Sequence, residues 1–294
     1  MYKIQKKTFI SEKIFLMDIE APMTARNCQP GQFVIVKADE KGERIPLTIC
    51  DFDREKGTVT IVVQIVGASS LKLSLLNEGD CLDTFAGPLG RYSELLDMPE
   101  EELKKKKILF VAGGVGAAPV YPQVKWLHEH GVQADCIIGA RNRSLVILEE
   151  EMRKVGNVYI STDEGDYGFK GNVTQRIRHL IDEEKKEYDL VIAIGPLIMM
   201  KFVSLLTGEY GIKTIVSMNP IMVDGTGMCG ACRLVVDGKV KFACVDGPEF
   251  DGHKVDFDQV IKRQTMYRTL EGRAMLKAQE GATHHGSCGN CRED

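Results

Sequence analysis

The feature that most constrains the fold of this chain is a series of five apolar, strand-like segments between residues 108 and 220. A stretch of helical character separates each segment from the next, as in AAPVYPQVKWLHEHG (117–131). A regular alternation of strands and helices is typical of parallel sheets whose helices cover both faces. We therefore expect a parallel, doubly wound sheet built from ILFVAGG (108–114), ADCIIGAR (134–141), VYISTDEG (158–165), DLVIAIGP (189–196) and KTIVSMNP (213–220).

The first 97 residues follow a different pattern. Short β-rich runs such as FVIVKAD (33–39) and TVTIVVQIV (58–66) alternate with turn residues such as Pro30-Gly31, which favours an antiparallel barrel or sandwich. The whole chain then divides into four regions: an antiparallel β-barrel (1–97), an α/β domain (98–220), a cysteine-containing segment (221–258) and a helical extension with a polar tail (259–294).

Composition excludes several classes of function. The 294 residues carry a formal net charge of -4, which gives no electrostatic reason to expect a nucleic-acid partner. No window approaches the roughly 20 apolar residues of a membrane span, and the amino terminus lacks a long apolar core. We therefore expect a cytoplasmic protein that binds neither nucleic acid nor membranes.

Three of the nine cysteines stand close together in the stretch VDGTGMCGACRLVVDGKVKFACVDGP (223–248). Because the nine are odd in number and unevenly spaced, the clustered ones are better explained as metal ligands than as disulfides in a reducing compartment. The Asp237-Gly238 turn predicts a hairpin that brings Cys232 and Cys244 together. Clustered cysteines of this kind can bind either an iron–sulfur cluster or, in a zinc knuckle, a zinc ion. Zinc sites usually pair two short-spaced motifs and this segment has one CxxC, so the iron–sulfur cluster is favoured.

The carboxyl-terminal tail, THHGSCGNCRED (283–294), is a separate candidate. Its His284, His285, Cys288 and Cys291 could bind a metal or a redox partner. Short polar tails are usually disordered, and we favour that interpretation here.

A glycine-rich turn follows the first segment of the α/β region, where Gly113, Gly114 and Gly116 precede a helix. Glycine there lets the backbone approach a pyrophosphate, and the helix N-terminus supplies free amides. Alone this is a weak signal, because any tight strand-to-helix turn needs glycine. Three more loops follow strands at the same edge, namely GAR (139–141), STDEG (161–165) and GP (195–196), and together the four favour a nucleotide site.

In the β-rich region, ERIPLTIC (43–50) places Arg44 shortly before Pro46 and Thr48. An arginine can hold a phosphate through two hydrogen bonds, and a rigid strand edge can offer backbone and hydroxyl groups to a flat heterocycle. By itself, Arg44 is better explained as an exposed strand arginine. The order of the motifs along the chain changes that interpretation.

Five motifs follow one another in the order RIPLT (44–48), VGASSLKLSLLNEGD (66–80), GPLG (87–90), GGVGAAP (113–119) and IGP (194–196). This order resembles that of the ferredoxin reductase-like flavoproteins, in which an FAD-binding barrel precedes an NAD(P) domain, and it covers nearly the whole chain. The resemblance implies that the flavin is held by Arg44, Pro46, Leu47 and Thr48, with Gly67, Ser69 and Ser70 at its phosphates. It also implies a nicotinamide nucleotide site lined by Gly113, Gly114, Gly116, Arg141, Asp163, Gly195 and Pro196.

The spacing Cys229-x2-Cys232-x11-Cys244 resembles the last three ligands of the [2Fe-2S] site in the electron-transfer subunit of dihydroorotate dehydrogenase. Where that family has its first cysteine, this chain has Asp224. The aspartate, the motif order and the longer carboxyl-terminal extension resemble the small subunit of the NADH-dependent reduced ferredoxin:NADP oxidoreductase, an electron-bifurcating transhydrogenase also called a sulfide dehydrogenase subunit. The resemblance implies that the metal ligands are Asp224, Cys229, Cys232 and Cys244.

The function that this resemblance implies is electron transfer between NAD(H), FAD and a [2Fe-2S] cluster. We expect no catalytic acid–base residue, because positioning and tuning suffice for that chemistry. The implied partner is a larger flavin and iron–sulfur subunit that connects the chain to ferredoxin and NADP(H). The alternatives are the electron-transfer subunit of dihydroorotate dehydrogenase and a non-enzymatic cluster or zinc carrier. Asp163 and Glu164 favour NADH, whereas Arg141 and Arg143 could take a 2′-phosphate, so the expectation of NADH rests on the resemblance.

Overall fold

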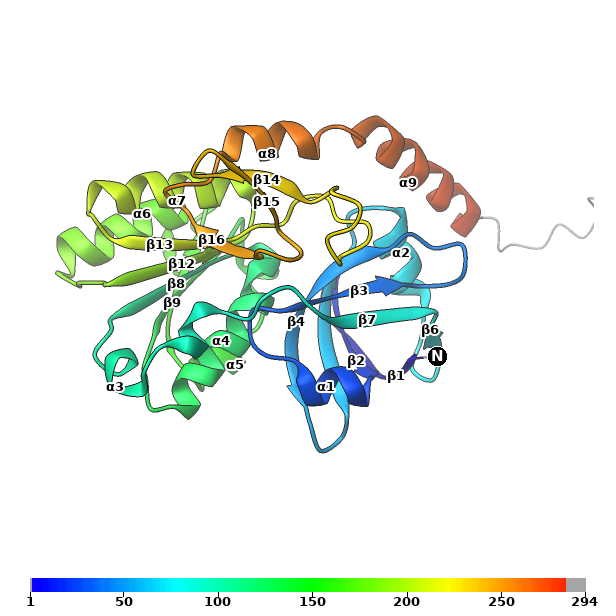
Figure 1. Cartoon of the computed structure of the whole chain (residues 1–294), viewed down its shortest axis with the longest axis horizontal. Coiled ribbons are helices and arrows are strands. Elements are labelled where there is room, and N and C mark those ends of the chain that lie inside the picture. The colour runs from blue at the N-terminus through cyan, green and yellow to red at the C-terminus, as the bar shows by residue number, and fades with distance from the viewer. Residues whose placement is uncertain (1, 284–294) are drawn as a thin grey trace, which may run out of the picture.

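The structure is a computed structural model that describes residues 2–283. Its first seven strands are β1 (Tyr2–Ser11), β2 (Ile14–Glu20), β3 (Phe33–Lys37), β4 (Ile45–Asp53), β5 (Thr58–Gln64), β6 (Cys81–Leu82) and β7 (Thr84–Leu89). They form an antiparallel sheet in the order β6-β1-β2-β5-β4-β3-β7, which curls into a near-barrel (Figure 1). Along β5, Val59, Ile61 and Val63 point into the barrel core, as alternation in a strand requires. The predicted antiparallel barrel is confirmed.

The second sheet contains the five predicted strands as β8 (Ile108–Gly113), β9 (Asp135–Ala140), β10 (Asn157–Thr162), β12 (Leu190–Ile194) and β13 (Lys213–Ser217). Two short strands that the sequence did not predict, β11 (Phe169–Lys170) and β16 (Glu249–Asp251), extend its two edges. The order is β11-β10-β9-β8-β12-β13-β16, and every neighbouring pair is parallel except β13 and β16. The predicted parallel, doubly wound sheet is confirmed.

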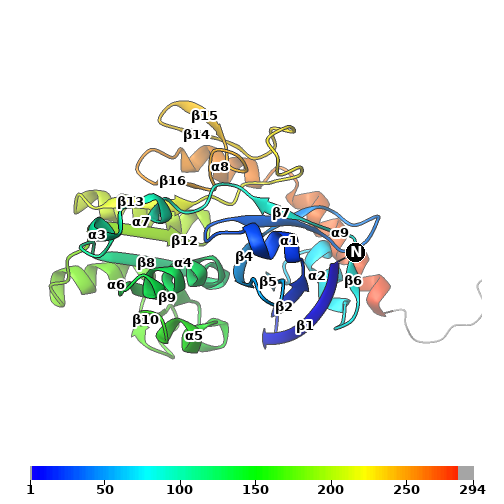
Figure 2. The same cartoon turned by 60° about the horizontal axis from the view of Figure 1, so that its bottom comes forward.

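Helices cover both faces of this second sheet (Figure 2). Residues Phe110 and Ala112 of β8 pack on the side of α4 (Ala117–Glu129) and α5 (Glu149–Arg153). Leu109 and Val111 pack on the side of α6 (Val173–Arg178) and α7 (Leu197–Glu209). Within residues 2–283, no helix combines the length and the apolar character needed to cross a membrane. The remaining helices and helical turns are α1 (Pro22–Asn27), α2 (Ala68–Leu75), η1 (Glu94–Asp97), α3 (Glu100–Leu103), η2 (Gly114–Gly116), η3 (Arg143–Leu145), η4 (His179–Glu183), α8 (Phe257–Gln264) and α9 (Arg268–Thr283).

The cysteine segment forms a small third unit beside the two sheets (Figures 1 and 2). The predicted hairpin is confirmed, because β14 (Arg233–Val236) pairs antiparallel with β15 (Lys239–Phe242). Both residues of its turn adopt positive φ, 52° at Asp237 and 70° at Gly238, as a tight hairpin turn requires. The stretch after it, expected to be helical, is divided into α8 and α9. In Figure 1, α9 lies over α2 of the barrel, so this extension returns to the first part of the chain.

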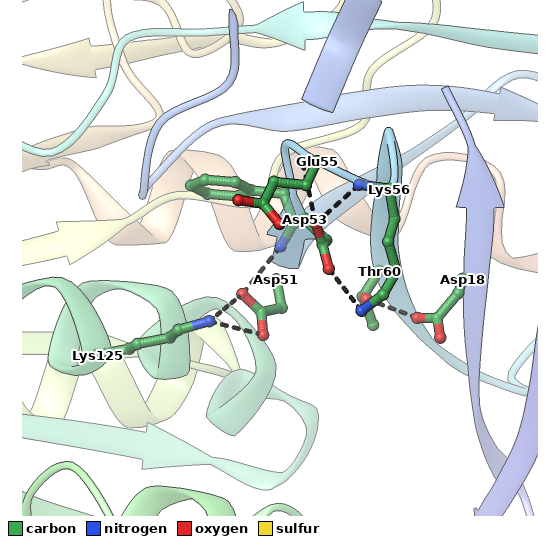
Figure 3. A network of polar contacts seen from close by, with 8 residues as sticks. Asp18, Asp51, Asp53, Glu55, Lys56, Thr60 and Lys125 are labelled. Carbon is green, nitrogen blue, oxygen red and sulfur yellow. Dashed lines mark hydrogen bonds and ion pairs between the residues drawn. The ribbon is translucent and has the colours of Figure 1, made fainter. Parts of the chain in front are cut away.

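The barrel meets the α/β sheet through α4, which packs against β4. Figure 3 shows the polar contacts on one side of this junction, where Lys125 of α4 donates to both carboxylate oxygens of Asp51 on β4, at 2.8 and 3.0 Å. Within the barrel, the Thr60 hydroxyl donates to Asp18 at 2.6 Å. These residues border a cavity of about 880 Å³ between the two parts of the chain. The Lys125–Asp51 pair therefore ties the two sheets together.

Candidate functional site

The glycine turn lies at the centre of the parallel sheet, where the strand order reverses. Because β9 lies on one side of β8 and β12 on the other, the loops after β8 and β12 meet at the carboxyl edge, which is where open α/β sheets bind ligands. A Cβ added to Gly116 would lie 2.1 Å from the carbonyl oxygen of Ile194. Glycine is therefore required there for the approach of the two loops, and this supports part of the steric reasoning behind the prediction.

A cavity of about 310 Å³ opens at this edge. Five of the seven residues predicted for the nucleotide site line it, namely Gly113, Gly114, Arg141, Asp163 and Pro196. The other two are adjacent, because Gly195 lies against Gly113 and Gly116 ends the turn η2 as the N-cap residue of α4. The fold therefore brings the predicted set together around one cavity, below the amino end of a 13-residue helix.

Arg141 is not a free cation in the structure. Its Nε donates to Glu164 at 2.8 Å, and the amide of Asn142 donates to the second oxygen of the same carboxylate at 3.2 Å. A 2′-phosphate that approached Arg141 would also meet this carboxylate. The sequence left open whether the acidic or the basic side chains of this pair of loops decide between NADH and NADPH. In the structure, Arg141 and Glu164 pair with each other.

The residues predicted for the flavin lie on an incompletely paired strand. Pro46, Leu47 and Thr48 of β4 pair with β3, whereas pairing of β4 with β5 begins only at Ile49. One edge of this stretch is therefore not used by the sheet ladder and can offer backbone groups to a flat ring system.

The predicted phosphate-binding residues lie at the amino end of α2. A Cβ built on Gly67 would have no heavy atom within 4 Å, so there is open space above this residue. Ser69 donates to Glu43, which precedes Arg44, and this contact brings α2 next to the start of β4. The Ser70 hydroxyl accepts from the backbone amides of Val66 and Gly67 at 2.9 and 3.0 Å, so it caps its own helix.

Arg44 makes a contact that the sequence did not reveal. Its Nε donates to the carbonyl oxygen of Val223 at 3.0 Å, and its Nη2 donates to that of Asp224 at 3.2 Å. The arginine therefore joins the barrel to the cysteine loop across about 180 residues of sequence. No local pattern signals such a partner.

Two of the three clustered cysteines form a buried pair. The Sγ atoms of Cys232 and Cys244 lie 3.2 Å apart, as the hairpin prediction requires. Burial, together with the neighbouring Cys232 thiol, raises the pKa of Cys244 to about 12. Two thiols this close are difficult to ionise without a cation, and a bound metal would supply the charge that makes both of them thiolates.

Cys229 has the opposite character. It is exposed, and hydrogen bonds from backbone amides, that of Ala231 foremost, lower the pKa of its thiol. The loop around it can turn its amides inward because Gly225, Gly227 and Gly230 have φ of 83°, 89° and 65°. Backbone amides directed at sulfur are the donors that stabilise cluster thiolates, so this loop fits an iron–sulfur ligand.

Asp224 caps a turn in the structure. Its Oδ2 accepts from the backbone amide of Thr226 at 2.9 Å, from the Thr226 hydroxyl and from the amide of Met228 at 3.4 Å, and the hydroxyl contact is the main reason for its lowered pKa. In residues 2–283, no three His, Cys, Asp or Glu side chains form a group that could hold one metal ion. The assignment of Asp224 as a ligand stays a prediction. The residues His284, His285, Cys288 and Cys291 lie outside the described part of the chain.

Comparison with known proteins gives two matching family models. Residues 219–256 match the iron–sulfur cluster binding domain of dihydroorotate dehydrogenase B, and residues 110–205 match the oxidoreductase NAD-binding domain. These segments contain the cysteine loop with its hairpin and the core of the parallel sheet, respectively.

Individual relatives match over almost the full length. An uncharacterized protein in the adh 3′ region of Clostridium beijerinckii is 60% identical over the whole of both chains. A Thermotoga maritima homologue of the electron-transfer subunit of dihydroorotate dehydrogenase B (NAD(+)) is 45% identical over 92% of both chains. In a solved structure of NADH-dependent reduced ferredoxin-NADP oxidoreductase, from a study of flavin-based electron bifurcation, one chain is 42% identical, with a TM-score of 0.87 over 94% of this chain and 97% of that one.

Proposed function

The chain belongs to the family of dihydroorotate dehydrogenase B electron-transfer subunits and their homologues, and from this premise we propose that it transfers electrons between NAD(H), FAD and a [2Fe-2S] cluster. We further propose that it is the small subunit of an electron-bifurcating NADH-dependent ferredoxin:NADP oxidoreductase. The observation that carries this proposal is the cysteine loop, in which a buried thiol pair and an amide-stabilised thiol follow Asp224. We assign FAD to residues 1–97, NAD(H) to 98–220 and the cluster to 221–258, with 259–294 as an extension.

The barrel residues fit a flavin. The edge of Pro46, Leu47 and Thr48 that β5 leaves unpaired would hold the ring system, and the open amino end of α2 at Gly67 would face the phosphates. Ser69 would stand beside the phosphates, while Ser70 would shape the turn through its own capping bonds. When bound, FAD supplies the conversion between two-electron and one-electron transfer. This chain's part is to position that ring between the nucleotide cavity and the cysteine loop.

The nucleotide cavity fits NAD(H) better than its 2′-phosphorylated form. Gly113, Gly114 and Gly116 let the backbone approach the pyrophosphate, and Asp163 lines the same cavity. Glu164 already compensates the charge of Arg141, which is the cation that a 2′-phosphate would need. We therefore propose NADH as the nucleotide that this chain uses.

The arrangement of the cysteines favours a [2Fe-2S] cluster over zinc. A structural zinc ion needs four ligands around one point, and among residues 2–283 the structure brings together only the pair of Cys232 and Cys244. A [2Fe-2S] cluster takes two protein ligands on each iron. We propose that Cys232 and Cys244 hold one iron, and that Cys229 and the carboxylate of Asp224 hold the other.

The surface around Cys229 supports docking of a larger subunit. Met228, next to it in the loop, is 88% exposed, and Val223 and Val245 nearby are 51% and 49% exposed. Exposed apolar side chains grouped around a one-electron centre fit a protein partner that must approach the cluster closely. We propose a larger flavin and iron–sulfur subunit as that partner, with ferredoxin and NADP(H) reached through it. Several relatives are named as electron-transfer subunits of dihydroorotate dehydrogenase B, so a dihydroorotate-oxidising subunit is the second candidate partner.

The partner is tested by purifying the complex from its native source. Co-purification of a flavin and iron–sulfur subunit that reduces ferredoxin supports the bifurcating assignment. Co-purification of a dihydroorotate-oxidising subunit would replace it with the second candidate.

The ligand set is tested by substitution in the loop. We expect Asp224→Cys to keep a cluster with altered absorption and potential, because a hard oxygen donor is exchanged for a soft sulfur. We expect Asp224→Ala to make the cluster labile. Thr226→Val is the matched control, because it removes the hydrogen bond that the Thr226 hydroxyl donates to Asp224 while leaving the carboxylate in place. Equal cluster loss in Asp224→Ala and Thr226→Val would show that Asp224 only caps the turn.

A further inference from the structure

A second group of polar side chains, two of them buried and one partly buried, lies where the three parts of the chain meet. Ser93 comes from the segment that leaves the barrel, Gln123 from the middle of α4, and Glu249 from β16, which follows the cysteine loop. Ser93 and Gln123 are almost completely buried, at 0% and 1% exposure. Gln123 Nε2 donates to Glu249 Oε1 at 2.8 Å, so two of the three parts are joined by a direct hydrogen bond.

This group is incomplete as a hydrogen-bond network. Glu249 Oε2, Gln123 Oε1 and Ser93 Oγ are each closed off from solvent and lack a hydrogen-bond partner in the structure. Buried polar atoms are nearly always paired in native proteins, so three unpaired ones side by side require an explanation. A proton on Glu249 and an ordered water would supply the missing donors.

The charges around Glu249 disfavour its ionised form. Glu249 borders a cavity of about 540 Å³, and the other titratable side chains that line it are Arg91, Tyr92, Glu94, Asp97, Asp246 and Asp251. Among the described residues, Glu249 has no ion-pair partner, whereas Lys213, Lys241 and Lys254 pair with Glu94, Asp246 and Asp251. Burial, helped by the charge of Glu94, raises the pKa of Glu249 to about 7. The carboxyl group can therefore exchange a proton near neutral pH.

The group is also close to the residues proposed to bind the cofactors. A Cβ on Gly31 would lie 2.8 Å from the backbone nitrogen of Ser93 and 3.4 Å from Glu249 Oε1. The next residue, Gln32, lines the cavity, and its carbonyl oxygen accepts from the amide of Ile49, immediately after Thr48. Arg91 and Tyr92, which also line the cavity, are exposed. Through Gln32 the cavity is therefore one backbone hydrogen bond away from the strand proposed to bind the flavin, and it reaches solvent at Arg91 and Tyr92.

The proposed function creates a need for such a group. Oxidation of NADH by one-electron acceptors follows NADH → NAD⁺ + H⁺ + 2e⁻, so one proton must leave the protein for each pair of electrons that leaves. Reduction of NAD⁺ in the opposite direction takes up one proton. A hydride passed from one nicotinamide to another requires neither. Only the path through the one-electron centre therefore needs a proton route.

We propose that Glu249, held by the hydrogen bond from Gln123, is the proton-exchange group that carries this proton between the proposed flavin site and the solvent. The C–H bond of the reduced nicotinamide breaks, its electron pair leaves as two single electrons, and its proton forms an O–H bond at Glu249 Oε2. That O–H bond breaks again when the proton passes to water in the cavity. This inference rests on the proposed function. It adds a titrating residue to a site for which the sequence predicted none.

The test compares two acceptors in the complete, cofactor-loaded protein with NADH as the donor. Ferricyanide accepts single electrons, and thio-NAD⁺ accepts a hydride. We expect Glu249→Gln, which keeps the shape but cannot titrate, to slow ferricyanide reduction by about tenfold or more and to leave hydride exchange unchanged. Asp97→Asn, at an exposed carboxylate of the same cavity, should change neither rate.

Equal ferricyanide rates in wild type and Glu249→Gln would overturn the proton-exchange proposal. Absence of hydride exchange in the wild type would instead overturn the proposed function. If Glu249→Gln does not fold, the proton-exchange proposal is tested on the wild type alone. The measurement is then the infrared difference spectrum between its oxidised and reduced forms. We expect a carboxylic-acid carbonyl band that responds to reduction and titrates near pH 7. The absence of any such band would refute the proposal.

Discussion

Replacing Gly116 with alanine places a methyl group where the structure has no room for one. The added Cβ would lie 2.1 Å from the carbonyl oxygen of Ile194, 2.8 Å from its carbonyl carbon and 3.2 Å from the Cα of Gly195. All three atoms belong to the backbone, so no side-chain rotation can relieve the contact. Either β12 or the turn before α4 must move by about 1 Å to restore an ordinary contact distance.

Gly114 provides a matched control two residues away. A Cβ there would have no heavy atom within 4 Å, but the residue has a φ of 56°, which costs an L-residue about 1 kcal/mol. Overpacking in a rigid environment costs about 1 to 3 kcal/mol, and a contact with backbone on both sides belongs at the upper end. We therefore expect Gly116→Ala to lose about 3 kcal/mol of unfolding free energy and Gly114→Ala about 1 kcal/mol.

Two measurements check this expectation. In thermal unfolding, Gly116→Ala should melt at least about 6 °C below the wild type, and Gly114→Ala about 2 °C below it. In calorimetric titration with NADH, Gly116→Ala should bind about tenfold more weakly, because the turn that meets the pyrophosphate is displaced. Similar melting temperatures for the two variants, with wild-type NADH affinity in both, would refute the close approach of the two loops.

Three further predictions concern the cysteines, the junction of the sheets and pH. In the metal-free protein, iodoacetamide should label Cys229 first, because it is exposed with a lowered pKa, and Cys136 last, because burial raises its pKa; equal labelling by peptide mass mapping would contradict this. Lys125→Met should lower the free energy of unfolding by about 1 kcal/mol, because it leaves the Asp51 carboxylate without its ion-pair partner, and adding Asp51→Asn should restore part of this loss. A double-mutant cycle in which the two changes are not coupled would argue against the ion pair. Because the folded-state pKa of Glu249 is raised from 4.5 to about 7, its contribution to the free energy of unfolding is fully present below pH 4.5 and is lost as pH rises through 7. The stability of wild type relative to Glu249→Gln should therefore fall by up to about 3 kcal/mol over this range in urea titrations, and a flat difference would contradict the shifted pKa.

The sequence predicted those parts of the fold that depend on local pattern. The five parallel strands were evident because the five apolar runs are separated from one another by helical stretches. The hairpin was evident because Asp237-Gly238 suits a tight turn. β16 was missed because Glu249–Asp251 is three residues long and shows no alternation. It becomes a strand only because the edge of β13 is available to pair with it.

The predicted site residues show the same division. Glycine at 116 follows from the steric demands of one turn, and the structure reproduces them. The partner of Arg44 lies about 180 residues away, and the direction of the Asp224 carboxylate depends on the amides of its own loop. Glu249 gave no signal, because a single glutamate after a Gly-Pro pair is unremarkable until three segments bury it. These features depend on packing between segments that are far apart in the chain, and such contacts cannot be inferred from the local patterns of a single sequence.

The pairing of β16 with β13 has a consequence for how the chain can be divided. β13 would otherwise end the sheet with unsatisfied amides and carbonyls, and bare edges of this kind recruit strands from other molecules. Residues 249–251, which come after Cys244, cover Ser217, Val216 and Ile215 of that edge. A fragment cut at residue 220 would lose this cover and become prone to self-association. The cluster segment and the nucleotide sheet are therefore not interchangeable modules, and recombination between relatives should preserve them as one inherited block.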